Sequence, residues 1–490
     1  MSVGVLALDQ GSHASRACIF DHRGALLASA TVPVETRHPA PAHVEQDALE
    51  LVQSLRAAAR QAIAAAHRAE PRLRLEAAGL AVQRSTIVCC SRFSGAPLTP
   101  AISWLDRRHA AWLETLAPQA ERIRELTGLP LSPHYGASKL RWCLEQLPQV
   151  ARSASHGDLL AAPLASYLSA TLTHCAQRGR DVRVDAANAS RTLLYDSQRG
   201  DWSGELLDCF GIERDWLPRC APTQDDWGIL DLGDCQVPLR AVTGDQSAVP
   251  YAAGPPGTDT VYINLGTGAF IQRPLRARPA APAPLLGSVL SSAPDAVLYS
   301  LEGTVNGAGS ALAWYCEQQR CVESELWAAL ETLAHGSGRH GAALPVFVNS
   351  LGGLGSPWWR AGPQTRFLHR AGAAAGTHEH LLAGFAAVVE SIAFMIAANA
   401  EWLVRKCGPL QGIELAGGMS QSAWLCGRLA SLLEVSLSLA APQASARGVA
   451  RLAAPELAAR WPPAPRRTWD PAPAPGLRER YGEFRAAIGP

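Results

Sequence analysis

A short acidic turn near the start of the chain has residue types suited to holding a phosphate group. It runs Asp9-Gln10-Gly11-Ser12 and is followed by His13, Ser15 and Arg16. Glycine lets the backbone approach an anion closely, and the N–H groups and hydroxyls of such a turn donate hydrogen bonds to phosphate oxygens. Asp9 can orient a hydrated Mg²⁺, which takes one or two carboxylates and keeps several waters. Alone, the segment also fits an ordinary hairpin turn with a capping aspartate.

A second carboxylate with catalytic potential occurs in Gly244-Asp245-Gln246, directly after an apolar run. A carboxylate at the end of a strand can take the proton from a hydroxyl as that oxygen attacks phosphorus, which is general-base catalysis. Gln246 can hold another hydroxyl of the same substrate. The alternative is that Asp245 only caps the N-terminus of a helix.

Two polar clusters in the first half of the chain suit a polyhydroxylated ligand. They are Gln83-Arg84-Ser85-Thr86 and Trp104-Leu105-Asp106-Arg107-Arg108. Together they supply guanidinium groups, a carboxylate and an aromatic face, which is the set of groups that binds such a ligand. Surface ion pairing explains the same residues equally well.

Glycine clusters recur in the second half, at residues 264–268, 303–309, 352–355 and 417–420. Each follows an apolar run, and glycine turns at strand ends are places where a backbone can lie against a nucleotide. Any one of them is compatible with a routine turn, but their number favours a binding role.

These segments need a framework of strands and helices to bring them together. Residues 3–8, 17–20 and 25–31 read as three apolar strands that form a β-meander. The alanine-rich residues 48–69 have helical spacing, and residues 75–83 read as a further strand. Helices and strands therefore alternate as in an open mixed sheet of an α/β protein.

A second α/β unit is expected from about Leu239, where a strand runs into the 244–246 turn. A further strand, 261–265, leads into another glycine turn. The chain therefore repeats the strand-and-turn pattern with which it begins. We therefore predict two similar domains, 1–238 and 239–490, that face one another across a cleft, the natural place for a ligand. Residues 273–296, rich in proline and alanine, are predicted to be a surface loop.

The composition indicates a globular protein and excludes several function classes. Of the 490 residues, 48% are hydrophobic and 18% are charged, close to globular averages. The 44 Lys and Arg residues against 43 Asp and Glu leave a formal net charge of +1, too small for a nucleic-acid or anionic-membrane partner. Neither of the two lysines, Lys139 and Lys406, follows a glycine, which excludes a P-loop.

The location expected from the sequence is the cytoplasm. The chain starts with a strand-like segment and has no basic region or cleavage site of a secretion signal. Its twelve cysteines include no C-x-x-C pair, as expected for reduced thiols. The most hydrophobic later stretch, 381–404, contains Glu390, Glu401 and many alanines, so we predict a buried core helix and no membrane span.

Taken in order, segments of this chain resemble the FGGY carbohydrate kinases, and within that family the glycerol kinases. They include LALDQGSHASRACIFDHRG, QRSTIV, AISWLDRR, TGLPLSPHYGASKLRW, TGDQSAVPY, INLGTGAF, YSLEGTVNGAGSALAW and LAGGMS. The resemblance covers nearly the whole chain. It implies an α/β fold of two actin-like ATPase domains, related to ribonuclease H, with ATP and substrate in the interdomain cleft.

The resemblance also implies a function: a kinase that uses ATP and Mg²⁺ to phosphorylate a terminal hydroxyl of a small polyol or sugar. It makes Asp245 the general base, places Asp9 near Mg²⁺, and implies a homodimer or homotetramer. The implied nucleotide contacts are Gly11, Ser12, His13, Ser15, Arg16, Gly266, Thr267, Gly309, Gly418 and Met419. The implied contacts to the acceptor are Arg84, Ser85, Trp104, His134, Tyr135, Asp245, Gln246 and Phe270.

Several positions depart from the pattern of glycerol kinases. Ser85 stands where a glutamate is usual, and His134 stands where a tyrosine is usual, although Tyr135 is adjacent. His13 and Met419 are also atypical in the two nucleotide turns. Because substrate hydroxyls left unpaired cost about 1–3 kcal/mol each, glycerol is the first expectation and a four- or five-carbon polyol or ketose the alternative. A non-catalytic relative that binds nucleotide or sugar is the third interpretation.

Overall fold

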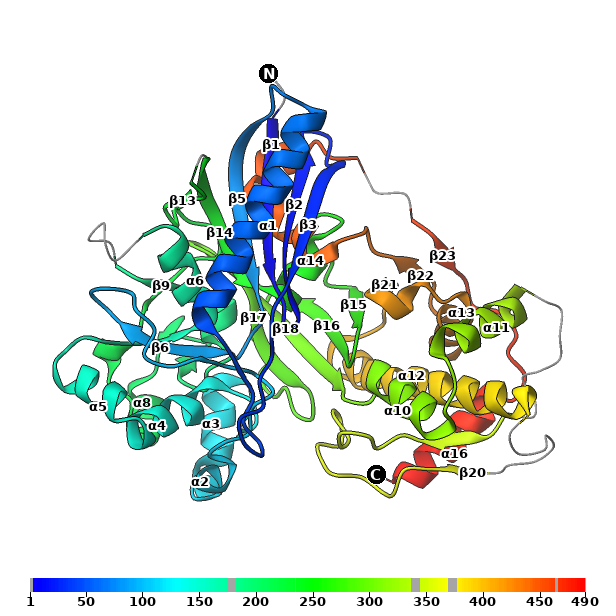
Figure 1. Cartoon of the computed structure of the whole chain (residues 1–490). Coiled ribbons are helices and arrows are strands. Elements are labelled where there is room, and N and C mark those ends of the chain that lie inside the picture. Colours follow the sequence, from blue (N-terminus) through cyan, green and yellow to red (C-terminus); the bar gives the residue numbers. More distant parts are fainter. Residues whose placement is uncertain are drawn as a thin grey trace.

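A six-stranded mixed sheet forms the centre of the first of two lobes (Figure 1). The computed structural model describes residues 3–174, 181–233, 235–335, 344–368, 377–462 and 466–489. The sheet contains, in spatial order, β13 (Ile229–Asp231), β14 (Gln236–Gly244), β5 (Arg74–Val82), β1 (Val3–Gln10), β2 (Ala14–Asp21) and β3 (Leu26–Pro33). The antiparallel meander predicted for the start of the chain is confirmed, since β1 pairs with β2 and β2 with β3.

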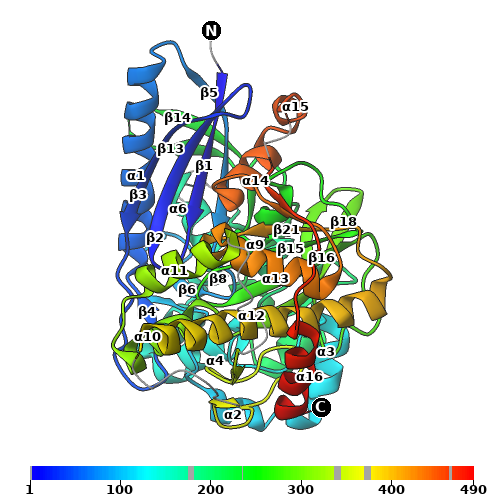
Figure 2. The same cartoon turned by 90° about the vertical axis from the view of Figure 1, so that its right-hand side faces the viewer.

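Two helices from opposite ends of the chain cover the two faces of this sheet (Figure 2). The predicted helix α1 (Ala48–Ala69) begins at Asp47, whose carboxylate accepts two backbone N–H groups of the first turn, as an N-cap should. Helix α14 (Ala444–Ala453) packs on the other face. A side chain at Gly79 of β5 would block this packing, because its Cβ would lie 2.6 Å from the carbonyl oxygen of Val449.

A seven-stranded sheet forms the centre of the second lobe. Its strands, in spatial order, are β17 (Leu286–Ala293), β18 (Ala296–Val305), β16 (Ala269–Leu275), β15 (Thr260–Leu265), β21 (Gly412–Ala416), β22 (Leu437–Leu439) and β23 (Thr468–Trp469). Strands β15 and β16 form an antiparallel hairpin, and β21 lies parallel to β15. The same arrangement is formed by β1, β2 and β5 in the first lobe. The prediction that the chain repeats its first strand-and-turn pattern is therefore confirmed.

Two sequence-based boundaries need correction. The strand expected to open the second unit, β14, is hydrogen-bonded parallel to β5 in the first sheet. A boundary between residues 238 and 239 would divide that strand, so the first sheet ends at Gly244 and the second starts at Thr260. The predicted surface loop 273–296 is also wrong in part, because residues 286–293 form the mostly buried strand β17. Apolar residues at its start pack against the first lobe.

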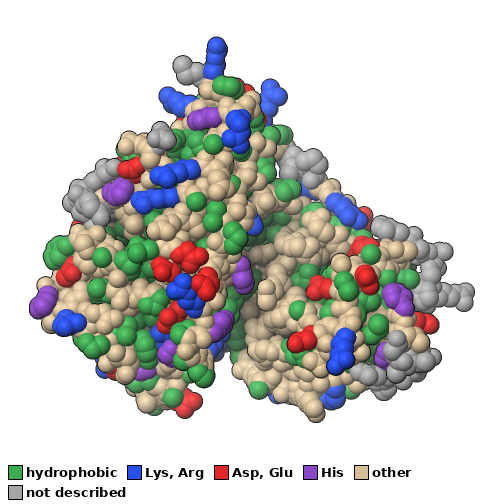
Figure 3. Space-filling model, in the orientation of Figure 1, with side chains coloured by type: hydrophobic (Ala, Val, Ile, Leu, Met, Phe, Trp, Pro, Cys, Tyr) green, Lys and Arg blue, Asp and Glu red, His purple; other side chains and the backbone are tan. Residues whose placement is uncertain are grey.

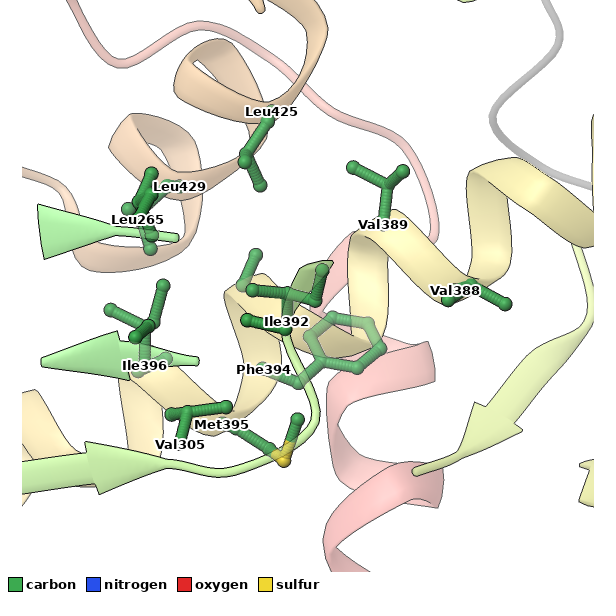
Figure 4. Close-up of a cluster of buried hydrophobic side chains, with 14 of the residues drawn as sticks. Leu265, Val305, Val388, Val389, Ile392, Phe394, Met395, Ile396, Leu425 and Leu429 are labelled. Carbon is green, nitrogen blue, oxygen red and sulfur yellow. The ribbon is translucent and has the colours of Figure 1, made fainter. Parts of the chain in front are cut away.

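The core of the second lobe is built around one long helix, α12 (His378–Cys407). Figure 4 shows Ile392 and Ile396 of this helix beside strand residues such as Leu265, while Phe394 lies against the C-terminal helix. By length and composition α12 could cross a membrane, but 83% of its most apolar stretch is buried inside the protein. The prediction of a core helix over 381–404 is therefore confirmed.

The remaining elements complete the two lobes. In the first lobe they are β4 (Glu45–Gln46), β6 (Ile87–Ser91), β7 (Ala101–Ile102), α2 (Ala110–Glu114), α3 (Ala120–Thr127), α4 (Gly136–Gln146), α5 (Pro148–Ser155), β8 (Leu159–Pro163), α6 (Leu164–Leu172), β9 (Arg183–Asp185), α7 (Ala186–Ala189), β10 (Tyr195–Asp196), β11 (Asp201–Trp202), α8 (Gly204–Phe210) and β12 (Arg219–Ala221). Later in the chain follow α9 (Asp245–Ala248), α10 (Gly309–Gln319), α11 (Glu323–His335), β19 (Val346–Val348), β20 (Arg366–Leu368), α13 (Ala423–Leu433), α15 (Pro455–Ala458) and α16 (Leu477–Ile488). Every cysteine in the described ranges is a free thiol, and Cys175 lies outside them.

Candidate functional site

The ends of strands from both lobes surround one cavity of about 460 Å³, called here the cleft cavity. Of the residues predicted from the sequence, it brings together Asp9, Gly11, Arg16, Asp245, Gln246 and Gly418. The rest of its wall is formed by Val249, Asn264, Ala416, Gly417, Ser420, Gln421 and residues 439–445. The space-filling view shows a furrow between the two lobes (Figure 3).

Asp9 lies near the end of β1 and is almost completely buried. Its carboxylate accepts a hydrogen bond of 2.6 Å from the Ser445 hydroxyl, and Arg16 Nη1 lies 3.7 Å from Asp9 Oδ2. Burial raises the pKa of Asp9, and the two neighbours oppose that shift. Because burial disfavours the charged form, a cation in the cavity would stabilise this carboxylate.

Asp245 is the first residue of α9, directly after β14. Its Oδ1 accepts the backbone N–H of Gln246 at 2.7 Å. Burial raises the pKa of Asp245 to about 6, against the opposing charge of Arg84, and Asp9 adds to the rise. At neutral pH the group is therefore mostly ionised and can still accept a proton, which is the property expected of a general base.

Asp9 is the candidate ligand for a metal ion, and Asp245 lies on the wall of the same cavity. Among the described residues, no group of three or more His, Cys, Asp or Glu side chains could hold a metal by themselves. The carboxylate of Asp9 suits Mg²⁺ nevertheless, because this ion can bind a protein through a single carboxylate and takes its other oxygens from water and phosphate.

The first turn uses its side chains for internal contacts. The Ser12 hydroxyl donates to Gln83 Oε1 at 3.1 Å and accepts Trp104 Nε1 at 2.9 Å. His13 is exposed. Ser15 is fully buried and hydrogen-bonded to Gln10 and to Ser54 of α1, so the structure does not bring it to the cleft cavity.

The second turn, Gly266 and Thr267, is exposed and is held by backbone hydrogen bonds. The N–H of Gly309 donates to the Gly266 carbonyl at 3.1 Å, and the N–H of Ser310 donates to the Thr267 carbonyl at the same distance. Phe270 is half-buried on β16, opposite Asn264. These residues lie next to the cavity through Asn264 but do not line it.

A glycine pair after β21 forms the far wall of the cavity. Gly417 has φ of 92°, and a Cβ there would clash with the carbonyl oxygen of Leu265. Gly418 has open space where its Cβ would be. Met419, predicted to contact the nucleotide, is half-buried and packs against the hydrophobic core of the second lobe.

The predicted acceptor residues gather beside Asp245 in a region we call the aromatic compartment, made of Arg84, Trp104, His134 and Tyr135. The ring of His134 lies edge-on to Trp104, with centroids 5.6 Å apart, and to Tyr135, with centroids 5.0 Å apart. The stem of Arg84 packs so closely on Gly244 that a Cβ there would lie 2.6 Å from it. The compartment therefore adjoins the general-base candidate.

Arg84 is held by a carboxylate from the other half of the chain. Its two terminal nitrogens each donate to one oxygen of Glu302 at 3.0 Å, and Arg191 also donates to that carboxylate. Although burial opposes it, the charges of Arg191 and Arg84 lower the pKa of Glu302 to about 2. The Ser85 hydroxyl, by contrast, is buried without a hydrogen-bond partner in the described residues.

Sequence reasoning missed four residues that shape the site. Glu302 and Arg191 fix Arg84, Ser445 binds Asp9, and the fully buried Lys139 donates from Nζ to the carbonyl oxygens of Ser85 and His134. Glu302 falls inside one of the family-like segments, which is a signal that could have found it. Ser445 gave no local signal, because its partner is distant in sequence.

Comparison with solved structures identifies the fold. The structure of Plasmodium falciparum glycerol kinase with ADP matches with a TM-score of 0.80 and 20% identity, covering 99% of this chain and 92% of that chain. The xylulose kinase of Rhodospirillum rubrum matches with a TM-score of 0.81 and 22% identity, covering 99% and 98%. This likeness confirms the predicted class: a two-domain α/β protein with the actin-like ATPase fold.

The sequence comparison is more specific. The chain matches the FGGY family of carbohydrate kinases, N-terminal domain, over residues 4–266, and the C-terminal domain of that family over residues 261–456. The protein therefore belongs to the FGGY family of carbohydrate kinases. The glycerol kinase of Halorhodospira halophila is 31% identical over 440 residues, covering 88% of this chain and 83% of that protein. The glycerol kinase of Thermus brockianus is 34% identical over 437 residues, covering 88% and 85%.

Proposed function

We propose that this carbohydrate kinase transfers the γ-phosphoryl group of ATP to a terminal hydroxyl of a small polyol or sugar, with Asp245 as the general base. The observation that carries the proposal is the position of Asp245. Its carboxylate lines the cleft cavity together with Asp9 and Gly418, and it also adjoins Arg84 of the aromatic compartment. One carboxylate thus faces both the cleft cavity and the aromatic compartment, whose polar groups can bind hydroxyls.

The chain supplies three groups of contacts for the reaction. Asp245 takes the proton of the attacking hydroxyl, and Gln246 orients a neighbouring hydroxyl. Arg16 and the backbone N–H groups of the first turn donate to phosphoryl oxygens, where charge develops in the transition state. Asp9 would hold Mg²⁺, which when bound neutralises phosphate charge and helps to align the transferred group.

The nucleotide is proposed to extend from the two turns toward Gly417 and Gly418. Backbone without side chains leaves room for the sugar and base, as glycine turns at strand ends do in other nucleotide sites. Gly266, Thr267 and Gly309 remain proposed contacts on this side. The Ser12 hydroxyl is engaged with Trp104 and Gln83, so the backbone N–H groups of the first turn are its proposed phosphate donors.

Glycerol is the first proposed acceptor, and a four- or five-carbon polyol or ketose is the second. The curated relatives named above are glycerol kinases, which supports the first choice. Ser85 in place of the usual glutamate removes a long polar side chain from the wall of the compartment, which supports the second. A homodimer or homotetramer remains a prediction that sedimentation analysis will test.

The test is a coupled ADP-release assay of the purified protein with MgATP and a panel of glycerol, dihydroxyacetone, erythritol, threitol, pentitols, pentuloses, hexuloses and the corresponding aldonic acids. Selective turnover of any of these supports the proposal and names the acceptor. No ADP release above the acceptor-free rate across the panel would contradict it and would favour a non-catalytic binding role.

A further inference from the structure

The guanidinium of Arg107 lies at the edge of the aromatic compartment with part of its hydrogen-bonding capacity unused. Its Nη1 donates to the carbonyl oxygens of Trp104, at 2.9 Å, and Asp106, at 3.2 Å. No described residue accepts from Nε or Nη2, and neither atom is among the buried side-chain atoms that lack a hydrogen-bond partner. These donors are therefore open to a ligand.

Among the described residues no carboxylate forms an ion pair with Arg107, although the charge of Asp106 favours the protonated form of its guanidinium. The adjacent Asp106 is taken by Arg108, which donates to both of its oxygens at 2.8–3.0 Å, and by the backbone N–H of Val44 at 2.6 Å. Glu302 is shared between two other arginines. Burial lowers the pKa of Arg107, which reflects the cost of keeping this cation partly out of water.

The neighbouring charges are also mostly positive. Burial, followed by the charges of Lys139, Arg107, Arg191 and Arg84, lowers the pKa of His134 well below its usual value. The imidazole is thus neutral at physiological pH and does not add to the positive charge. The facing negative groups are Glu302, already shared by Arg84 and Arg191, and Asp245, which the proposed function uses as the base.

We propose that the acceptor is a polyhydroxy acid whose carboxylate is bound by Nε and Nη2 of Arg107, beside Trp104 and His134. A guanidinium offers two parallel N–H groups on one edge, which match the two oxygens of a carboxylate. A neutral polyol would leave these donors facing only water. The inference rests on the proposed function, because it names the substrate class of the same site.

The reaction balances as an ordinary phosphoryl transfer. The acceptor hydroxyl at the end remote from the carboxylate forms the new O–P bond, and the bond between the γ-phosphorus and the bridging oxygen of ATP breaks. ADP leaves with that electron pair, and Asp245 receives the hydroxyl proton. The carboxylate of the acceptor takes no part in bond making and serves to position the chain.

Matched pairs of acceptors test the proposal on the full-length protein with MgATP. The pairs are glycerol and glycerate, erythritol and erythronate, and xylitol and xylonate, and kcat/KM is measured by ADP release. We expect the acid of at least one pair to exceed its polyol by about tenfold or more, as expected for a charge-assisted contact at a partly exposed site. A polyol that is preferred over its acid in every pair would overturn the proposal and leave the proposed function intact.

Variants assign the preference to one side chain. Arg107→Gln is expected to remove most of the acid preference through a higher KM for the acid, and Arg107→Lys is expected to restore part of it. Arg199→Gln is the matched control, because Arg199 is a highly exposed arginine on another surface. An unchanged acid-to-polyol ratio in Arg107→Gln, or in Arg107→Lys if the glutamine variant does not fold, would overturn the assignment.

A binding measurement separates failure of this inference from failure of the proposed function. Without nucleotide, at least one of glycerate, erythronate and xylonate is expected to raise the Tm of the wild-type protein and not that of Arg107→Gln. If no acceptor is phosphorylated, the proposed function fails, and this shift still decides whether Arg107 binds a carboxylate. Equal shifts in the two proteins, or none in either, would count against the acid site.

Discussion

Both lobes contain the same type of β-hairpin, but the residues next to the turn differ. In the β1–β2 hairpin, Asp9 lies opposite Arg16, and both are charged. In the β15–β16 hairpin, the corresponding position before the turn is Asn264, which lies opposite the apolar Phe270. The backbone plan is therefore repeated, while only the first copy has a charged pair at this position.

The strands that run parallel to β1 and β15 also differ in the residues that follow them. After β5 come the long polar side chains of Gln83 and Arg84, whereas after β21 come Gly417 and Gly418. One lobe thus offers side-chain donors and acceptors suited to hydroxyl groups, and the other offers bare backbone suited to a flat or bulky ligand. A duplicated fold can divide one reaction between its copies by changing only the residues at the strand ends.

The comparison predicts that residues of the first lobe perform the chemical step. The substitution Asp245→Asn should have the largest effect on that step. We expect kcat to fall by about 10²–10⁴-fold, because the amide cannot accept the hydroxyl proton. ATP binding, measured by fluorescence or calorimetry, should remain within a few-fold of wild type. Asp208→Asn, at an exposed site, is the control. A kcat for Asp245→Asn close to that of the control would refute the general-base assignment.

The pH dependence of the wild-type enzyme tests the same assignment without a mutation. Asp245 acts in its ionised form, and its pKa is raised to about 6. Below that value the carboxylate becomes protonated, so kcat/KM should fall about tenfold for each further pH unit, while it should be flat between pH 7 and 8. A profile that is flat down to pH 5 would contradict the prediction.

In the second lobe, Gly417→Ala should mainly affect stability. The positive φ and the clash with the Leu265 carbonyl should lower the free energy of unfolding by about 1–3 kcal/mol, measured by denaturant titration. Gly418→Ala is the matched control, since its Cβ meets open space. It should keep its stability but raise the KM for ATP if the nucleotide lies there. Equal stability losses in the two variants would show that the local geometry is not the cause.

The smallest expected effects come from the two turn hydroxyls. Ser12→Ala removes the contacts to Trp104 and Gln83 and should raise the acceptor KM about fivefold, the effect of losing roughly 1 kcal/mol. Thr267→Ala, on the exposed turn, should instead raise the KM for ATP a few-fold and leave the acceptor KM unchanged. Steady-state kinetics with both substrates varied will distinguish the two. The reverse pattern would mean that the turns do not divide the substrates as proposed.

Local sequence patterns were enough to predict the hairpins, α1 and the core helix, because apolar runs, alanine spacing and glycine turns act within a few residues. Together with the family resemblance, they also predicted that Asp9, Asp245 and Gly418 face one interdomain cleft. Strand alternation explains the failure at Ser15: neighbouring side chains on β2 point to opposite faces, and Arg16 takes the face of the cavity.

What the sequence could not predict depends on contacts between distant segments. Membership of β14 in the first sheet is decided by its pairing with β5, which leaves no mark in the strand itself. Likewise, the Arg84–Glu302 pair joins residues 218 positions apart. Such contacts are selected by packing and charge in the folded protein, so neither partner signals the other locally.

The return of α14 to the first lobe has a consequence for how the protein is made. Val5, Ala7 and Ala77 of the first sheet pack against this helix, so their face remains uncovered on the ribosome until residues 444–453 have been synthesised. An apolar sheet face left open in a nascent chain invites aggregation. The N-terminal lobe is therefore completed only after nearly all of the other lobe has been translated, and chains truncated before Ala444 should depend on chaperones to stay in solution.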